Sequence, residues 1–168
     1  MNTNSKSQLF FTIILIFALV LPTLSQAITF DVIGPCSLTP LFKGSFKTDL
    51  SENAGKISMD IFDFNKIPYI GTQDGMNSIF ATPTGRDAME IISNTKMRAY
   101  GWCYSINGKL PNLLPSQSFL KKQSDHLIWF YAFSTYDNGI WLNYCIPSYT
   151  IKSPQFCKAS RFHTHPKH

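Results

Sequence analysis

The stretch His126-Leu127-Ile128-Trp129-Phe130-Tyr131-Ala132-Phe133-Ser134-Thr135-Tyr136 decides the fold class, because it is dense in the aromatic and β-branched residues that favour strands. Asp137-Asn138-Gly139 follows as a turn, and residues 140–149 return as a second strand. Before it, Lys96 to Ile106 has alternating character and predicts a third strand. One face of that strand carries Tyr100, Trp102, Tyr104 and Ile106. A β-sheet is therefore expected at the centre of the fold.

The segments between these strands contain turn residues. Asn107-Gly108 is suited to a two-residue hairpin turn, because both residues tolerate positive φ. Residues 110–118, with prolines at 111 and 115, are expected to form an irregular loop over a sheet edge.

The N-terminal half predicts further strands and one helix. Lys56 to Ile61 alternates polar and apolar residues as a strand does, and residues 39–50 could pair with it across a turn at 51–55. A helix is predicted from about Thr84 to Ser93, because Thr82-Pro83-Thr84 supplies a cap and residues 88, 91 and 92 form an apolar stripe. The expected class is α+β, with a mixed sheet of about five strands and this helix on one face.

Two motifs in this arrangement suggest a known family. Tyr104-Ser105-Ile106-Asn107-Gly108-Lys109 is followed by Asp125 to Tyr131, and the expected helix begins Thr84-Gly85-Arg86-Asp87-Ala88. In order and spacing these elements resemble the β-grasp family whose best-known member is the C-terminal domain of transcobalamin and intrinsic factor, a family also found in secreted bacterial proteins of unknown function. The resemblance spans residues 56–136 and implies a β-grasp-like sheet.

The same resemblance suggests cobalamin or another corrinoid as a minor candidate ligand. The vertebrate carriers clamp cobalamin between this domain and a helical barrel, which is absent from this chain. The glycine that usually opens the last strand is replaced by Ser124, and both Cys103 and residues 140–168 lie outside the family pattern.

The N-terminus reads as a secretory signal peptide covering residues 1–27. Lys6 precedes an apolar run at 9–21, Pro22 breaks the run, and Ser25-Gln26-Ala27 places small residues where a signal peptidase cleaves. An uncleaved membrane anchor is the alternative. Cleavage near Ala27 would leave a single domain over residues 28–160, a flexible tail at 161–168, and no transmembrane span in the mature protein. The expected location is periplasmic or secreted.

Export changes the interpretation of the four cysteines, Cys36, Cys103, Cys145 and Cys157. An even number of cysteines in an oxidising compartment predicts two disulfides. Zinc is the competing interpretation, but no two cysteines have the short spacing of a zinc site. The sequence leaves three connectivities open; the working hypothesis joins Cys36 to Cys157 across the ends of the domain and Cys103 to Cys145 between two strands.

Aromatic residues are the main candidates for ligand binding. The chain has 14 Phe, 7 Tyr and 3 Trp, more than a small core readily hides. A concave aromatic surface could stack on a flat ligand or a sugar; the competing interpretation places the same side chains in the core. The candidate ligand-binding residues are Trp102, Tyr104, Asn107, Trp129, Tyr131 and Trp141.

The residues that could support catalysis or metal binding are few. His126 next to Asp125 resembles an acid–base pair, but neighbours on a strand point to opposite faces. His163 and His165 lie in the polar tail. We therefore expect a disulfide-stabilised binding or interaction module without a cofactor, and a small envelope hydrolase or metal-dependent enzyme is the alternative. A pocket joining His126 to Asp60, Asp63 or Asp74 would favour the enzyme.

The partners of such a module follow from its charge and compartment. The net charge is +5, and the basic residues are scattered, so no stripe for nucleic acid is present. The expected partner of this monomer is a small molecule or an envelope protein.

Overall fold

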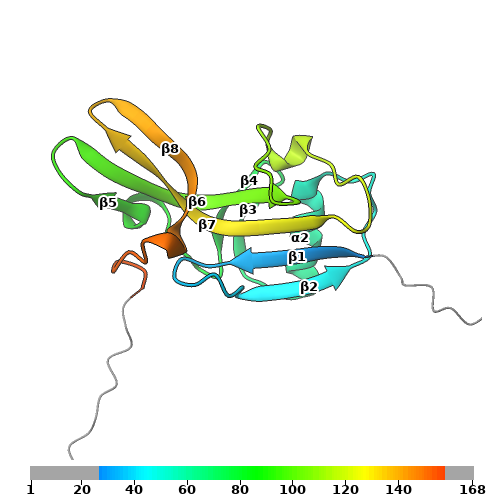
Figure 1. Cartoon of the computed structure of the whole chain (residues 1–168). Helices are drawn as coiled ribbons and strands as arrows, with labels where there is room; N and C mark the ends of the chain where they lie inside the picture. Colours follow the sequence, from blue (N-terminus) through cyan, green and yellow to red (C-terminus); the bar gives the residue numbers. More distant parts are fainter. Residues whose placement is uncertain (1–26, 158–168) are drawn as a thin grey trace, which may run out of the picture.

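The structure, a computed structural model, describes residues 27–157, and the fold is a curled mixed sheet with one α-helix in that range. The expected signal peptide up to residue 26 and the expected tail at 161–168 lie outside the described residues. The sheet strands, drawn in Figure 1, are β1 (Ile28–Ile33), β2 (Phe42–Phe46), β5 (Met89–Ile91), β6 (Lys96–Ile106), β7 (His126–Asp137) and β8 (Ile140–Pro147). The other elements are α2 (Ala54–Phe64), the hairpin β3 (Tyr69–Thr72) and β4 (Gly75–Ile79), and the 3₁₀ turns η1 (Gly85–Ala88), η2 (Pro115–Gln117) and η3 (Ser148–Thr150).

Strand β7 organises the sheet, whose order is β2-β1-β7-β6-β5. Along one side β7 pairs antiparallel with the whole of β6. Along the other side its first half pairs with β1 in parallel, and its second half pairs with β8. The expected α+β class with a mixed sheet is confirmed.

The strands predicted around β7 are also confirmed. The structure has strands at Lys96–Ile106, His126–Asp137 and Ile140–Pro147. Asn107 and Gly108 adopt the positive φ angles, 53° and 74°, that the turn requires. Residues 110–118 are irregular apart from the short turn η2, as expected.

The position of the helix was predicted wrongly. Residues 84–93 form the 3₁₀ turn η1 and the short strand β5, which pairs with β6. Gly85 has a φ of +59°, which a right-handed helix cannot continue. Ala88 is buried, but Ile91 and Ile92 are exposed, so two of the three residues of the supposed apolar stripe do not pack against the core.

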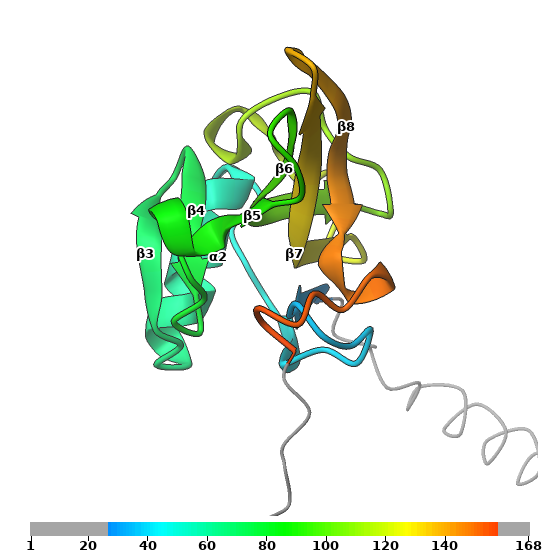
Figure 2. The same cartoon turned by 90° about the vertical axis from the view of Figure 1, so that its left-hand side faces the viewer.

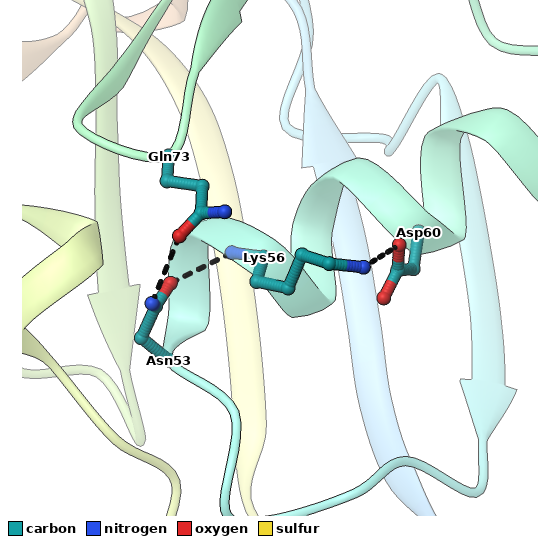
Figure 3. A network of polar contacts seen from close by, with 4 residues as sticks. All are labelled: Asn53, Lys56, Asp60 and Gln73. Carbon is teal, nitrogen blue, oxygen red and sulfur yellow. Dashed lines mark hydrogen bonds and ion pairs between the residues drawn. The ribbon is translucent and has the colours of Figure 1, made fainter.

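The α-helix is instead α2, over the segment that was predicted to be a strand. Ile57 and Ile61 satisfy both an alternating and a four-residue spacing, so the pattern alone did not separate the two structures. Asn53 begins the helix, since its side chain accepts a hydrogen bond from the N–H of Lys56 at 2.8 Å. Figure 3 shows this cap, together with the Asn53 contact to Gln73 and the Lys56–Asp60 ion pair.

The expected pairing of residues 39–50 with 56–61 is wrong as a consequence. Strand β2 pairs antiparallel with β1, whose segment 28–33 had not been predicted as a strand. The β3–β4 hairpin was also not predicted. Figure 2 shows that hairpin and α2 together on one side of the sheet.

The main core lies between α2 and the inner face of the sheet. Phe30, Val32 and Trp129 of the sheet pack there with Ile57 and Phe62 of the helix. A second cluster contains Tyr100, Tyr131 and Phe133, against which Phe156 of the C-terminal segment packs. The fold therefore buries most of its aromatic rings on one face of the sheet.

Two disulfides link the described chain, and they join the pairs of the working hypothesis. Cys36–Cys157 connects the β1–β2 loop to the C-terminal segment. Cys103–Cys145 connects β6 to β8 across the outer face of the sheet. All four cysteines are used, which favours an oxidising compartment.

Candidate functional site

Three of the predicted aromatic ligand-binding residues are core residues. Tyr131 is 0% exposed and Trp129 is 1% exposed, and Tyr104 is also buried. Trp129 donates from Nε1 to Ser58 Oγ at 2.8 Å, and the Tyr104 hydroxyl donates to the carbonyl oxygen of Leu113 at 2.7 Å. Because their polar atoms are satisfied inside the fold, these side chains stabilise the domain and are closed to a ligand.

Trp102 and Asn107 also have internal partners. The half-buried Trp102 donates from Nε1 to Thr82 Oγ1 at 2.7 Å. The side chain of Asn107 donates to Asp125 Oδ1 at 3.0 Å and accepts from the N–H of His126 at 2.9 Å. Asn107 thus ties the turn after β6 to the start of β7.

Two of the predicted residues, Trp102 and Trp141, line an open hollow, which we call the β8 groove. The groove has a volume of about 250 Å³ and is lined by residues of β6, of β7 and of β8, which pairs with β7. Small residues form its floor, and Trp141 and Tyr144 stand beside them. The lining residues are Ala99, Tyr100, Gly101, Trp102, Cys103, Ala132, Phe133, Ser134, Trp141 and Tyr144.

Gly101 leaves the floor of the β8 groove open because it has no side chain. A Cβ atom added at Gly101 would meet no atom within 4 Å, so the position faces open space. The disulfide Cys103–Cys145 holds β8 beside this floor. Strand β8 reaches that position through a bulge, at which Cys145 has a φ of 53°. The groove is thus a product of a glycine, a bulge and a disulfide acting together.

The walls of the β8 groove are apolar and uncharged. Trp141 is 39% exposed and Tyr144 is 67% exposed, and Ile140 and Leu142 of the same strand are also exposed. Residues 138–151 contain no charged side chain. A run of exposed apolar residues on an edge strand is unusual for a surface that contacts only water. This uncharged run was the sequence signal that could have located the groove.

His126 has a carboxylate partner, but it is none of the predicted ones. His126 Nε2 lies 3.0 Å from Oδ2 of the buried Asp31, on the neighbouring strand β1. Asp60 pairs with Lys56, and Asp74 accepts from Ser116 Oγ at 2.6 Å. The hydrogen bonds of residues 27–157 bring neither Asp60, Asp63 nor Asp74 to His126, so the arrangement that would favour an enzyme is not formed.

Asp125 has a structural role. Burial alone would raise the pKa of this carboxyl, but hydrogen bonds from the Asn107 side chain and from the N–H groups of Lys121 and Lys122 hold the pKa below its ordinary value. Its two oxygens are used in closing the turn before β7. Asp125 therefore anchors the turn between Lys121 and the start of β7.

The Glu90 carboxyl lies in a second polar cluster, at the edge formed by β5 and β6. Burial raises its pKa, but hydrogen bonds from Tyr100 at 2.6 Å and Arg98 at 3.0 Å prevail and leave the pKa below its ordinary value. Arg98 also lies over the Phe133 ring, 5.3 Å from its centroid. These contacts hold β5 against β6 and, with it, one end of the sheet.

Residues 27–157 contain neither a metal-binding cluster nor a membrane-spanning helix. Within residues 27–157, no three His, Cys, Asp or Glu side chains gather in a way that could hold a metal ion. Within the same residues no helix has the length and apolar character needed to cross a bilayer.

The described residues form a small α+β fold linked by two disulfides. No protein-family model matches the chain, and no curated protein matches it. Among solved structures, it is similar to the crystal structure of a proposed metal-binding protein from Ruminococcus gnavus ATCC 29149, with 15% sequence identity and a TM-score of 0.34. The similarity covers 62% of this chain and 95% of that chain.

Proposed function

We propose that the protein is an exported binding module whose ligand occupies the β8 groove. The observation that carries the proposal is the pairing of an open glycine floor with two exposed aromatic side chains, Trp141 and Tyr144, in an uncharged surface. Aromatic side chains bind flat rings through stacking, and an uncharged lining disfavours charged ligands, which would lose their hydration without compensation. The ligand class is therefore an uncharged molecule that presents a flat ring.

Export is the second part of the proposal. Two disulfides within residues 27–157 support an oxidising destination. Strand β1 begins at Ile28, directly after the expected cleavage position at Ala27. N-terminal sequencing of the protein recovered from the envelope or the medium should begin at Ile28, and an intact Met1 would contradict cleavage.

The β-grasp-like assignment is also a proposal. The chain forms the β1–β2 hairpin, crosses one face of the sheet as α2, and later returns as β7 in parallel beside β1. This order supports the resemblance, as do the Asn107–Asp125 contacts between its two strand motifs. The third element of the resemblance, the helix at Thr84, does not form. The β8 groove is too small to enclose a corrinoid, so cobalamin finds no support in it.

The binding test uses a small uncharged aromatic probe. We expect 5-fluoroindole to bind the disulfide-bonded protein, detected by a shift or broadening of its ¹⁹F resonance. Trp141→Ala should weaken binding by removing a stacking surface. Gly101→Val should block the floor, while the open space around Gly101 lets the fold tolerate the side chain.

A matched control is Phe119→Ala, which removes an exposed aromatic ring outside the groove. This variant should bind 5-fluoroindole as the wild type does. Tighter binding of methyl glucoside than of 5-fluoroindole would change the ligand class to a sugar. Unchanged probe binding by Trp141→Ala and Gly101→Val would reject the β8 groove as the site.

A further inference from the structure

A second hollow, which shares no residue with the β8 groove, lies between α2 and the chain that leaves β2. We call it the α2–β2 groove. Its volume is about 380 Å³, within the size range of small-molecule sites. Its lining residues are Phe46, Lys47, Thr48, Asp49, Glu52, Ile57, Asp60, Ile61 and Phe64.

The base of the α2–β2 groove is apolar. Ile57 and Ile61 lie one turn apart on the inner side of α2, and Phe46 lies beside them at the end of β2. Phe64, the last residue of the helix, is 81% exposed although it is a large aromatic side chain. An apolar base with an exposed ring beside it offers a ligand more contact than a solvated helix surface normally does.

The rim of the same groove is acidic. Its charged lining residues are three acids, Asp49, Glu52 and Asp60, and one lysine, Lys47. The Asp60 carboxylate is engaged by Lys56 (Figure 3), whereas neither Asp49 nor Glu52 takes part in an ion pair within residues 27–157. The chain as a whole carries a net charge of +5, so this rim is opposite in sign to the rest of the molecule.

The charge on Asp49 is secured by its local structure. Hydrogen bonds from the backbone N–H and the hydroxyl of Ser51 hold the pKa of the Asp49 carboxyl below its ordinary value. In the wall of the groove, Thr48 Oγ1 is buried without a hydrogen-bond partner among the described residues.

We propose that the α2–β2 groove binds an amphipathic cation, meaning an ammonium or guanidinium group carried on an apolar body. The apolar body would cover Ile57, Ile61 and Phe46, and the cation would lie toward Asp49 and Glu52. The exposed Phe64 ring can add a cation–π contact. An anionic ligand of the same shape is repelled by the rim.

The test compares three probes that share a phenyl ring and differ in charge. These are 2-phenylethylammonium, the neutral 2-phenylethanol and the anionic 3-phenylpropionate, each titrated calorimetrically into the disulfide-bonded protein. We expect the ammonium to bind about tenfold more tightly than the alcohol, because two carboxylates attract it at short range. The carboxylate should not bind. Raising the salt concentration should reduce the preference for the ammonium.

Variants separate the charge from the apolar contact. Asp49→Asn with Glu52→Gln, both at exposed positions, should lower the affinity for the ammonium to that for the alcohol and leave the alcohol unaffected. Phe64→Ser should weaken the binding of both the ammonium and the alcohol, because it removes an apolar contact. Asp87→Asn removes an exposed carboxylate outside the groove and should change nothing.

Three results would overturn the proposal: equal wild-type affinities for the ammonium and the alcohol, a charge preference that survives in the double variant, or no binding of any probe. The β8 groove is tested separately, because Gly101→Val removes any binding of the uncharged 2-phenylethanol to that groove. The preference for the ammonium over the alcohol should persist in this variant. The proposal for either groove can thus be rejected without affecting the proposal for the other.

Discussion

At the scale of single residues, aromatic side chains with the same sequence pattern have different roles. Trp129 and Tyr131 alternate on β7 as ligand-binding residues on an aromatic surface would, yet both are buried. Trp141, one strand later, is exposed in the β8 groove. The alternation identifies a face of a strand, and whether that face meets a helix or solvent depends on segments far away in the chain. Here α2 covers the face that carries Trp129.

The contact of Trp129 with Ser58 leads to a first prediction. Ser58 is fully buried, accepts from Trp129 Nε1 and donates to the carbonyl oxygen of Ala54 at 2.6 Å. Ser58→Ala leaves the indole N–H unpaired in the core and should lower the free energy of unfolding by about 1–3 kcal/mol. Urea denaturation measures the loss.

Ser124→Ala, at an exposed serine, is the control for this change and should have little effect. A double-mutant cycle with Trp129→Phe should show coupling between the two sites. If the two losses simply add, the hydrogen bond does not contribute as described.

The Asp125 carboxyl leads to a prediction about pH. Its pKa is lower in the folded state than in the unfolded state, so its contribution to stability is fully present above about pH 4 and is lost as the pH falls through the folded-state pKa. Asp125→Asn should lower the free energy of unfolding at pH 7 by about 2–3 kcal/mol, since it weakens hydrogen bonds to a charged acceptor. The difference from wild type should shrink between pH 5 and pH 2.

Chemical denaturation at several pH values measures that difference. Asp87→Asn, at an exposed carboxylate, should track the wild type throughout. A difference between Asp125→Asn and wild type that stays constant down to pH 2 would mean that the Asp125 charge does not stabilise the fold.

At the scale of elements, the segment predicted as a strand (residues 56–61) lies in the helix α2, and the segment predicted as a helix (residues 84–93) contains the 3₁₀ turn η1 and the strand β5. Both segments contain apolar residues at spacings that suit either structure. The outcome depends on the caps: Asn53 bonds to the N–H of Lys56, whereas Thr84 makes no side-chain capping hydrogen bond. The positive φ of Gly85 then excludes a right-handed helix at that point.

At Gly55, in the first turn of α2, we expect Gly→Ala to have the opposite effect on stability from the one it has in most helices. In an open helix, Gly→Ala is stabilising by about 1 kcal/mol. At Gly55 a Cβ atom would overlap the carbonyl oxygen of Gln73 in the β3–β4 turn. Gly55→Ala should therefore be destabilising, by about 1–3 kcal/mol, as thermal unfolding would show.

The matched control is Gly75→Ala in the same β3–β4 hairpin, where a Cβ atom would meet nothing within 4 Å. This variant should unfold close to the wild-type temperature. A Gly55→Ala protein as stable as wild type would mean that the helix and the hairpin are not in close contact.

At the scale of the whole molecule, the two disulfides act on different parts of the fold. Cys36–Cys157 closes a sequence separation of 121 residues, and Cys103–Cys145 closes one of 42. Removing Cys36–Cys157 by paired Cys→Ser substitution should lower the free energy of unfolding by about 3–5 kcal/mol. Removing the shorter link, Cys103–Cys145, should lower the free energy of unfolding by about 1 kcal/mol less than that, because a shorter loop restricts the unfolded chain less.

Guanidinium denaturation of the two paired variants compares these losses. The Cys103–Cys145 variant should in addition lose 5-fluoroindole binding, because that disulfide holds β8 at the groove. The Cys36–Cys157 variant serves as its control and should retain binding while folded. Equal 5-fluoroindole binding by both variants would mean that the Cys103–Cys145 disulfide is not needed to form the β8 groove.

The sequence by itself determined the strands β6, β7 and β8, their turns and the α+β class, because alternation and turn residues act within a few positions of the chain. It also supplied the paired cysteines. The tertiary structure alone decided which aromatic residues are buried, where the helix lies, and that two grooves form. The β8 groove needs Gly101 of β6 beside Trp141 and Cys145 of β8, and the α2–β2 groove needs β2 beside α2. Contacts between segments distant in sequence carry no periodic signal, so only the packed fold reveals them.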